Sequence, residues 1–191
     1  MKALHAPQRP FIAVATLTLL LAACASTPAS EISRMYKQVE VDEAGRAPGA
    51  GPDAGLLERR AQRARRAREI HAAHGLVSAS DYLKAAVILD ETDETEDLKL
   101  AQTLALEAAR LGEPLGYRVA AESIDKQLVK QGRPQRYGTQ YEWVPVLKSW
   151  RLYVVDPLTT DVERKAMGIP PLAELYKTEE RLNRNSKPPT H

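Results

Sequence analysis

Cysteine is nearly absent from this chain, since Cys24 is the only one in 191 residues. A single thiol excludes an internal disulfide framework and the zinc sites that need several cysteines. The stability of the folded part must therefore come from the packing of its side chains.

Long hydrophobic runs are missing as well. The apolar run near the N-terminus extends from Phe11 to Leu21 and is broken only by Thr16 and Thr18. It is too short for a membrane-spanning helix, which needs roughly 20 residues. We interpret the run as the apolar part of a cleaved signal peptide.

The residues around this run have the layout of a secretory signal. Lys2 and Arg9 precede the run, and two alanines separate it from the cysteine. The stretch 21–24, Leu-Ala-Ala-Cys, resembles the signal of bacterial lipoproteins. We therefore expect a lipoprotein signal peptide over residues 1–23. The alternative is an ordinary cleaved signal that is followed by an incidental cysteine.

The lipoprotein resemblance implies cleavage between Ala23 and Cys24, with diacylglycerol and a further acyl chain such as palmitate on Cys24. Two acyl chains attach a protein stably to a membrane, whereas one chain is marginal. By analogy with enteric bacteria, Ala25 implies the outer membrane, on its periplasmic side. The inner membrane and the cell surface are the alternatives.

The charge of the chain is balanced once the signal is removed. Residues 1–23 hold two of the 27 basic residues and none of the 25 acidic ones, so 25 of each sign remain. A neutral chain has no global electrostatic attraction to nucleic acid. Nucleic acid is therefore not an expected partner.

The composition divides the rest of the chain into three parts. Residues 24–55 are rich in Pro, Gly, Ala and Ser, and they predict a flexible tether that spans roughly 30 Å. Within this tether, residues 31–41 could instead dock on the domain. Residues 56–183 are enough for one modest domain. Residues 184–191 predict a disordered tail.

A helix rich in arginine is expected from Leu56 to His74. Its arginines lie on nearly all sides, and only a thin apolar stripe remains. One interpretation is a basic patch for the phosphate groups of lipids or lipopolysaccharide. The favoured interpretation is a solvated helix that faces an acidic cluster. The arginines are Arg59, Arg60, Arg63, Arg65, Arg66 and Arg68, and the cluster is Asp90, Glu91, Asp93, Glu94, Glu96 and Asp97.

Three further helices are expected to build a compact helical domain. Ser80 is the expected N-cap of the first, and Asp93 with Glu96 predicts a capping box for the second. The third runs from about 115 to 131, and short loops imply antiparallel neighbours. The second helix resembles a Sel1- or tetratricopeptide-type helix, but arrays of such units need about three repeats. A compact domain is therefore favoured over a solenoid.

A β-hairpin is expected next, because residues 141–146 and 150–155 are rich in aromatic and β-branched side chains. Lys148-Ser149 lies between the two strands, and Pro145 favours an edge strand. Short helices are expected over about 160–168 and 171–183. The predicted fold class is mainly α, with a small C-terminal hairpin and short terminal helices.

The least generic stretch is residues 132–140, Gly-Arg-Pro-Gln-Arg-Tyr-Gly-Thr-Gln. Together with Asp125 and a downstream pattern, it resembles a bacterial family of domains of unknown function. The downstream matches are Asp161, Arg164, Gly168, Pro170, Pro171 and Leu172. The chain departs from the family at Lys126, where many members have arginine, and at Leu76-Val77, where many have Trp-Pro. The resemblance covers about residues 70–176 and implies no activity.

Asp125 lies at the edge of the apolar face of its helix, so we expect it to be partly buried. A buried carboxylate needs a partner, and the candidates are Arg133, Arg136 and the Tyr137 hydroxyl. One interpretation is a structural polar network that holds the hairpin to the helices. The other is a polar pocket for a small ligand, formed by Asp125, Arg133, Gln135, Tyr137 and Gln140.

No motif in the sequence predicts catalytic chemistry or a cofactor. A Ser-His-Asp order, a metal-ligand spacing and a phosphate-binding loop are all missing. His71 and His74 are three residues apart on one helix and could share a metal. No third ligand lies nearby in the sequence, so we expect two surface histidines and no metal.

Two classes of function fit these features. The leading hypothesis is a non-catalytic, membrane-anchored domain that binds an envelope protein or supports an envelope complex, since helical hairpins expose grooves for peptides and helices. The alternative is an envelope enzyme or small-ligand binder that uses the polar pocket around Asp125 and the loop 137–140.

Overall fold

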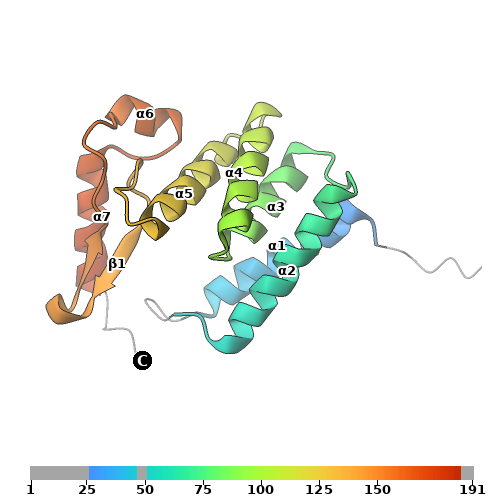
Figure 1. The fold of residues 1–191 in the computed structure, drawn as a ribbon, viewed down its shortest axis with the longest axis horizontal. Coiled ribbons are helices and arrows are strands. Elements are labelled where there is room, and N and C mark those ends of the chain that lie inside the picture. Colours follow the sequence, from blue (N-terminus) through green and yellow to red (C-terminus); the bar gives the residue numbers. More distant parts are fainter. Residues whose placement is uncertain (1–25, 47–50, 186–191) are drawn as a thin grey trace, which may run out of the picture.

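The computed structural model describes residues 26–46 and 51–185 of the chain. These residues are mainly helical, with one small antiparallel hairpin near the C-terminus (Figure 1), which confirms the predicted fold class. The predicted signal peptide, Cys24 and residues 186–191 of the predicted tail lie outside the described residues. Among the helices that are described, none combines the length and apolar character needed to cross a membrane.

The elements follow one another along the long axis of the molecule, from α1 and α2 at one end to the hairpin and α7 at the other (Figure 1). In chain order they are α1 (Pro28–Ala44), α2 (Ala54–Ala72), α3 (Ala79–Asp90), α4 (Thr95–Arg110), α5 (Leu115–Lys130), β1 (Tyr141–Val144), the 3-10 turn η1 (Pro145–Leu147), β2 (Ser149–Leu152), α6 (Asp161–Ala166) and α7 (Leu172–Asn185).

Helix α1 corrects the predicted tether. Ile32, Met35 and Val39 are buried along one face of this helix, and they pack with side chains of the neighbouring helices in the main core. Burial of this apolar stripe offsets the entropy cost of ordering the segment. A flexible tether is therefore wrong for the α1 segment, and the alternative, in which residues 31–41 dock on the domain, is confirmed.

The start of α1 has a defined cap. Thr27 is the N-cap residue, and its hydroxyl oxygen accepts the backbone N–H of Ser30 at 3.2 Å. Pro28 occupies the first turn, where its missing N–H needs no partner. The helix therefore begins at a definite residue near the N-terminal end of the described chain.

The starts of α3 and α4 differ from the predicted caps. Ser78, rather than Ser80, caps α3, and the Asp81 carboxylate accepts the Ser78 backbone N–H in return, which completes a capping box. Helix α4 starts after Glu94 without a side-chain cap, so the predicted box of Asp93 and Glu96 does not form. Ser78 is preferred because it places an acidic residue at the third helical position, as a capping box requires.

Helices α3, α4 and α5 form the centre of the main core, with short loops over residues 91–94 and 111–114. Small residues allow close approach of α5 to α4. A Cβ on Gly116 would lie 2.2 Å from the carbonyl oxygen of Ala105 and 2.8 Å from the nitrogen of Ala109. Alanines that line these helices, such as Ala101 and Ala120, are fully buried. The resemblance of α4 to a tetratricopeptide-type helix stays a prediction.

The hairpin forms where it was predicted, but its strands are shorter. Trp143 pairs with Trp150 across the two strands, and their rings meet edge to face with centroids 5.8 Å apart. Pro145 leaves the strand and starts η1, because proline cannot donate to the ladder. Lys148 then closes the turn in the left-handed conformation, with a φ of 46°.

Helix α7 holds the hairpin against the helices. The Glu179 carboxylate accepts the backbone N–H of Leu152 at 2.7 Å, and the Asn183 amide makes two hydrogen bonds to the Trp150 backbone. A second, smaller core lies beneath this unit and consists of Ala121, Tyr137, Ile169 and Leu175. Met167 packs against both cores and joins them.

Replacement of Ile32 by alanine tests the role of α1. Because Ile32 is fully buried, we expect Ile32→Ala to lower the free energy of unfolding by about 2–5 kcal/mol in urea denaturation. Val41→Ala on the same helix is the control, since Val41 is 71% exposed and its loss should change stability by less than about 0.5 kcal/mol. Equal small effects of both substitutions would show that α1 is not part of the folded core.

Candidate functional site

The loop of residues 132–140, which carries the distinctive motif, is folded around the carboxylate of Asp125. Asp125 projects from α5 and is fully buried. Its Oδ1 accepts the backbone N–H groups of Arg136 at 2.7 Å and Tyr137 at 2.9 Å. Its Oδ2 accepts the backbone N–H groups of Gly138 and Thr139 at 2.9 and 3.0 Å, and the Thr139 hydroxyl at 2.9 Å.

These contacts correct the expected partners of Asp125. Consecutive backbone amides surround the carboxylate, in the way that a backbone concavity binds an anion. Arg136 contributes its backbone N–H, while its guanidinium lies 5.3 Å from the centre of the Tyr137 ring. The Arg133 guanidinium donates to the Gln131 side-chain oxygen at 3.4 Å and makes no hydrogen bond to Asp125. The charge of Asp125 is thus stabilised by loop dipoles rather than by an arginine.

Gln135 connects the same loop to the segment that follows β2 of the hairpin. It is fully buried, and its Oε1 accepts the backbone N–H of Gln140 at 2.8 Å. Its Nε2 donates to the carbonyl oxygens of Gln140 and Tyr153 at 3.1 and 2.9 Å. The Gln140 side chain donates to the Thr139 hydroxyl. The Gln135 amide therefore bonds both to the loop and to the segment that follows β2.

The two halves of the family-like pattern meet in space. Arg164 of α6 is buried, and its Nε donates to the Tyr137 carbonyl oxygen at 3.2 Å. Its Nη1 pairs with Asp161 at 2.9 Å, and the same Asp161 carboxylate accepts the backbone N–H of Leu172. Burial raises the pKa of the Tyr137 hydroxyl above its ordinary value. The residues of the two halves of the pattern therefore belong to one connected network, which joins α5, the loop and α6.

Gly138 is required by this network for two reasons. Its φ of +94° is one that residues with a side chain rarely adopt. A Cβ at this position would also lie 2.5 Å from the Leu175 side chain. Glycine thus allows the loop to turn its amides toward the carboxylate while α7 packs against it.

The candidate pocket residues separate into two groups. Asp125, Gln135, Tyr137 and Gln140 come together in the hydrogen-bonded loop, whereas Arg133 is exposed. A cavity of 340 Å³ lies beside the loop and is lined by Ile124, Leu128, Arg133, Pro134, Arg136, Asp156, Leu158, Thr159 and Glu163. Of the five candidates, only Arg133 lines this cavity. The geometry favours the structural network over a pocket built from all five.

The arginine-rich helix α2 is paired with acidic side chains on two sides. Toward α1, the pairs are Arg59–Asp42 at 2.9 Å, Arg60–Glu43 at 2.8 Å, Arg63–Asp42 at 2.7 Å and Arg66–Glu31 at 2.8 Å. Toward the α3–α4 corner, Arg60 lies 3.0 Å from Glu91, and Arg68 pairs with Asp97. The favoured interpretation is a solvated helix that faces the acidic cluster. Contact with the cluster is confirmed for Glu91 and Asp97, but the helix is only partly solvated, since Arg63 is among its buried residues. The sequence does not predict the partners on α1, because the composition of that segment favours a flexible tether.

The pKa values of these acids follow from their surroundings. Hydrogen bonds from Arg59, and then from Arg63, lower the pKa of Asp42, and the Arg66 hydrogen bond lowers that of Glu31. Burial raises the pKa of Glu91, although the charge of Arg60 acts in the opposite direction. Asp42 and Glu31 are therefore charged at neutral pH and link α1 to α2.

The two histidines lie at the end of α2. His74 adopts a φ of 56° after the helix, and the next residue, Gly75, donates its N–H to the Ile70 carbonyl oxygen at 2.8 Å. This geometry terminates the helix. Within residues 26–46 and 51–185, no three His, Cys, Asp or Glu side chains are grouped so that they could hold a metal ion.

No family model, no curated protein and no solved structure matches this chain. The resemblance of the loop and its downstream pattern to a family of unknown function therefore stays a prediction.

Replacement of Asp125 by asparagine tests the network. The new side chain would have the same shape as aspartate but would place an NH₂ group against backbone donors, so we expect Asp125→Asn to lower the free energy of unfolding by about 2–4 kcal/mol. Asp93→Asn is the matched control, because Asp93 is exposed. Denaturant unfolding of both variants gives the comparison. Unchanged stability of Asp125→Asn would favour a ligand site instead.

Proposed function

We propose that this chain is a lipid-anchored protein of the bacterial envelope whose helical domain binds another envelope protein and does not catalyse a reaction. The observation that supports the proposal best is the position of α1. This helix belongs to the core and starts at Pro28, four residues after the proposed lipid-bearing Cys24. Four residues span at most about 14 Å, so an anchor at Cys24 would hold the domain against the membrane surface.

The fold gives such an anchored domain two distinct ends. The start of α1 lies beside the end of α2, because a Cβ on Gly75 would come within 2.9 Å of the Pro28 side chain. The hairpin lies at the opposite end of the long axis (Figure 1). With the α1 end at the lipid, the hairpin faces away from its own anchor.

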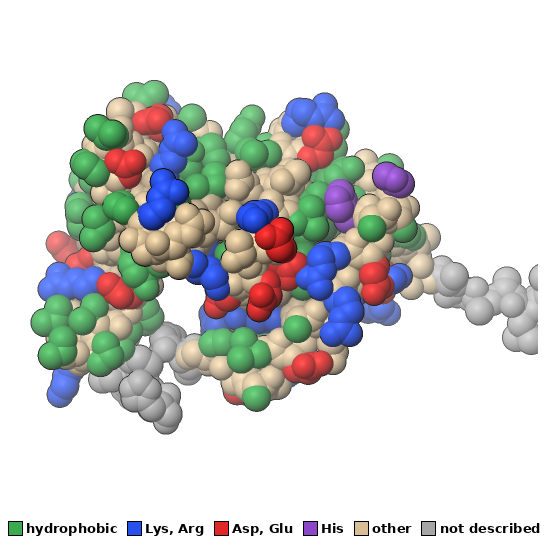
Figure 2. Space-filling model, in the orientation of Figure 1, with side chains coloured by type: hydrophobic (Ala, Val, Ile, Leu, Met, Phe, Trp, Pro, Cys, Tyr) green, Lys and Arg blue, Asp and Glu red, His purple; other side chains and the backbone are tan. Residues whose placement is uncertain are grey.

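The hairpin end carries features that suit a protein partner. Val146 and Leu147 in η1 are 87% and 55% exposed, and Figure 2 shows hydrophobic side chains gathered at this end of the molecule. The half-buried rings of Trp143 and Trp150 lie at the base of the turn. Partly exposed tryptophans next to aliphatic side chains are typical of the central contacts of protein interfaces.

The alternative, an envelope enzyme or small-ligand binder centred on Asp125, has less support. Both carboxylate oxygens of Asp125 already accept hydrogen bonds from the loop, and the residue is fully buried. A substrate group would have to displace these donors before it could contact the carboxylate.

Substitution of the cysteine tests the anchor. We expect Cys24→Ser to abolish labelling by a radioactive or clickable fatty acid and to release the protein from the membrane fraction, because serine cannot form the thioether. Wild-type protein in the same membranes is the reference. A Cys24→Ser protein that still carries label and sediments with outer membranes would disprove lipidation at this residue.

A photo-crosslinking amino acid tests the hairpin surface in intact cells. We expect a discrete crosslinked protein when the probe replaces Val146, and loss of this product when Leu147 is also changed to Asp, because a buried carboxylate disfavours an apolar interface. The probe at Val41, which is also exposed but lies on α1, is the control. The same product from both positions, or none from position 146, would argue against a partner at the hairpin.

A further inference from the structure

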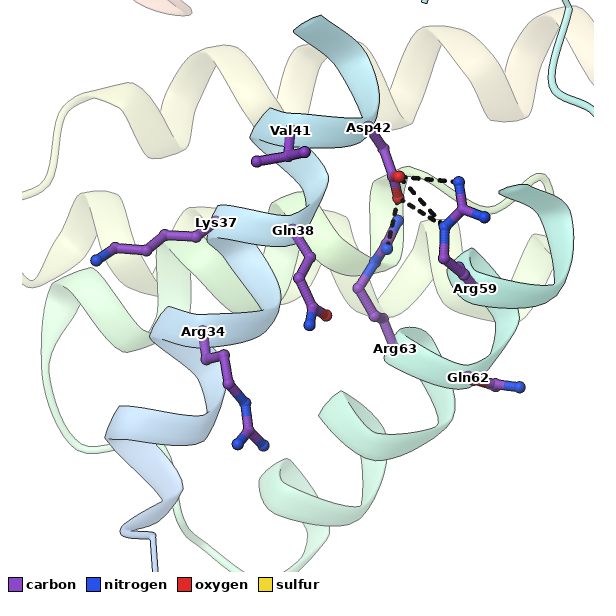
Figure 3. Close-up of a pocket in the computed structure, with 8 residues that line it drawn as sticks. All are labelled: Arg34, Lys37, Gln38, Val41, Asp42, Arg59, Gln62 and Arg63. Atoms are coloured by element: carbon purple, nitrogen blue, oxygen red, sulfur yellow. Dashed lines mark hydrogen bonds and ion pairs between the residues drawn. The ribbon is translucent and has the colours of Figure 1, made fainter. Parts of the chain in front are cut away.

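Helices α1 and α2 flank a cavity that is open to solvent and has no assigned role. Helix α1 packs closely on α3 but more loosely on α2, and a cavity of 490 Å³ lies between α1 and α2 (Figure 3). It is lined by Arg34, Lys37, Gln38, Val41, Asp42, Arg59, Gln62 and Arg63. The space is within the range of small-molecule sites, which are roughly 300–1,000 Å³.

The lining of this cavity is strongly positive. It holds four cationic side chains and one carboxylate, that of Asp42. Asp42 is already shared by Arg59 and Arg63, whose hydrogen bonds to it are drawn in Figure 3. Within residues 26–46 and 51–185, the side chains of Arg34 and Lys37 form neither a hydrogen bond nor an ion pair. The cavity therefore has more positive charge than its own carboxylate compensates.

Arg34 is the cation best placed to use this excess. It extends from α1 toward α2, as does Gln38 one turn later, whereas the Lys37 side chain leaves α1 in another direction (Figure 3). Glu31 interacts with the charge of Arg34, but its hydrogen bonds go to Arg66. The Arg34 guanidinium thus keeps its donors for a group within the cavity.

Arg63 adds a buried positive charge to the lining. Its side chain is only 5% exposed, and its Nη1 bonds to Asp42 at 2.7 Å. Its Nε and Nη2 are buried without a hydrogen-bond partner in the described part of the chain. A buried guanidinium with unsatisfied donors is costly. These two nitrogens are covered by protein, so an anion in the cavity would act on Arg63 through its charge.

We propose that the α1–α2 cavity binds a phosphate group, either on a lipid headgroup or on a soluble phosphate ester. A guanidinium matches the oxygens of phosphate with paired hydrogen bonds, and Arg34 supplies such donors, whereas Nε and Nη2 of Arg59 are already used by Asp42. The Gln38 amide adds a neutral donor. Arg34 lies six residues after Pro28, about 9 Å along the helix. If the chain is anchored at Cys24, headgroups are therefore within reach, but the phosphate site itself does not depend on the anchor.

Calorimetric titration of the full chain in neutral detergent tests the site. Glycerol 3-phosphate is the soluble ester, glycerophosphoglycerol is the headgroup of an anionic lipid, and glycerophosphocholine is the zwitterionic reference. We expect binding of at least one of the two anions, and at least tenfold weaker binding to Arg34→Gln. Gln38→Ala should weaken binding severalfold without any change in charge.

Arg65→Gln is the matched control, because it removes the same charge from an exposed position on α2 that does not line the cavity. Binding that is weakened by Arg34→Gln and kept by Arg65→Gln supports the site. The tighter of the two anions then assigns the source as lipid headgroup or soluble ester. No binding of either anion at millimolar concentration, or equal losses in both arginine variants, would overturn the proposal.

Discussion

A buried carboxylate determines the path of the chain between the helices and the hairpin. Asp125 cannot be removed from water without compensation for its charge, and the loop supplies that compensation with backbone amides from residues 136–139. To present these amides, the loop must turn at Gly138. The same turn brings Gln135 beneath the hairpin and places the Tyr137 carbonyl oxygen beside Arg164. The positions of the loop, of Gln135 and of Arg164 thus all depend on the buried charge of Asp125.

Much of the helical fold could be predicted from hydrophobic spacing and from stop signals such as Gly112. Helix α1 could not, because its apolar stripe of Ile32, Met35 and Val39 is narrow and is flanked by stretches typical of linkers. Its other stabilising contacts are ion pairs with α2 that join residues 17 to 35 positions apart. The hydrophobic pattern within one segment cannot predict ion pairs between residues so far apart in the sequence. The choice of Ser78 over Ser80 as a cap likewise depended on which serine faced Asp81 across one turn.

The site, too, could be predicted from the sequence only in part. Burial of Asp125 could be predicted from its place at the edge of an apolar helix face. Its donors could not, because every residue except proline has a backbone N–H and only the conformation of the loop aims them. In α2, six arginines look alike in the sequence, yet Arg63 is buried and Arg65 is exposed. The two arginines differ in burial because they lie at different positions around the helix relative to the buried Ala64 and Ala67.

The order of residues along the chain gives the Asp125 network a consequence for folding. Asp125 precedes all of its donors, which follow it by 11 to 14 residues, and Arg164 comes later still. In a chain that ended at α5, water rather than the loop would solvate the Asp125 carboxylate. The second half of α5 therefore reaches its buried state only when the segment that follows it has been added, whereas Ala120 packs in the main core with the helices that precede it.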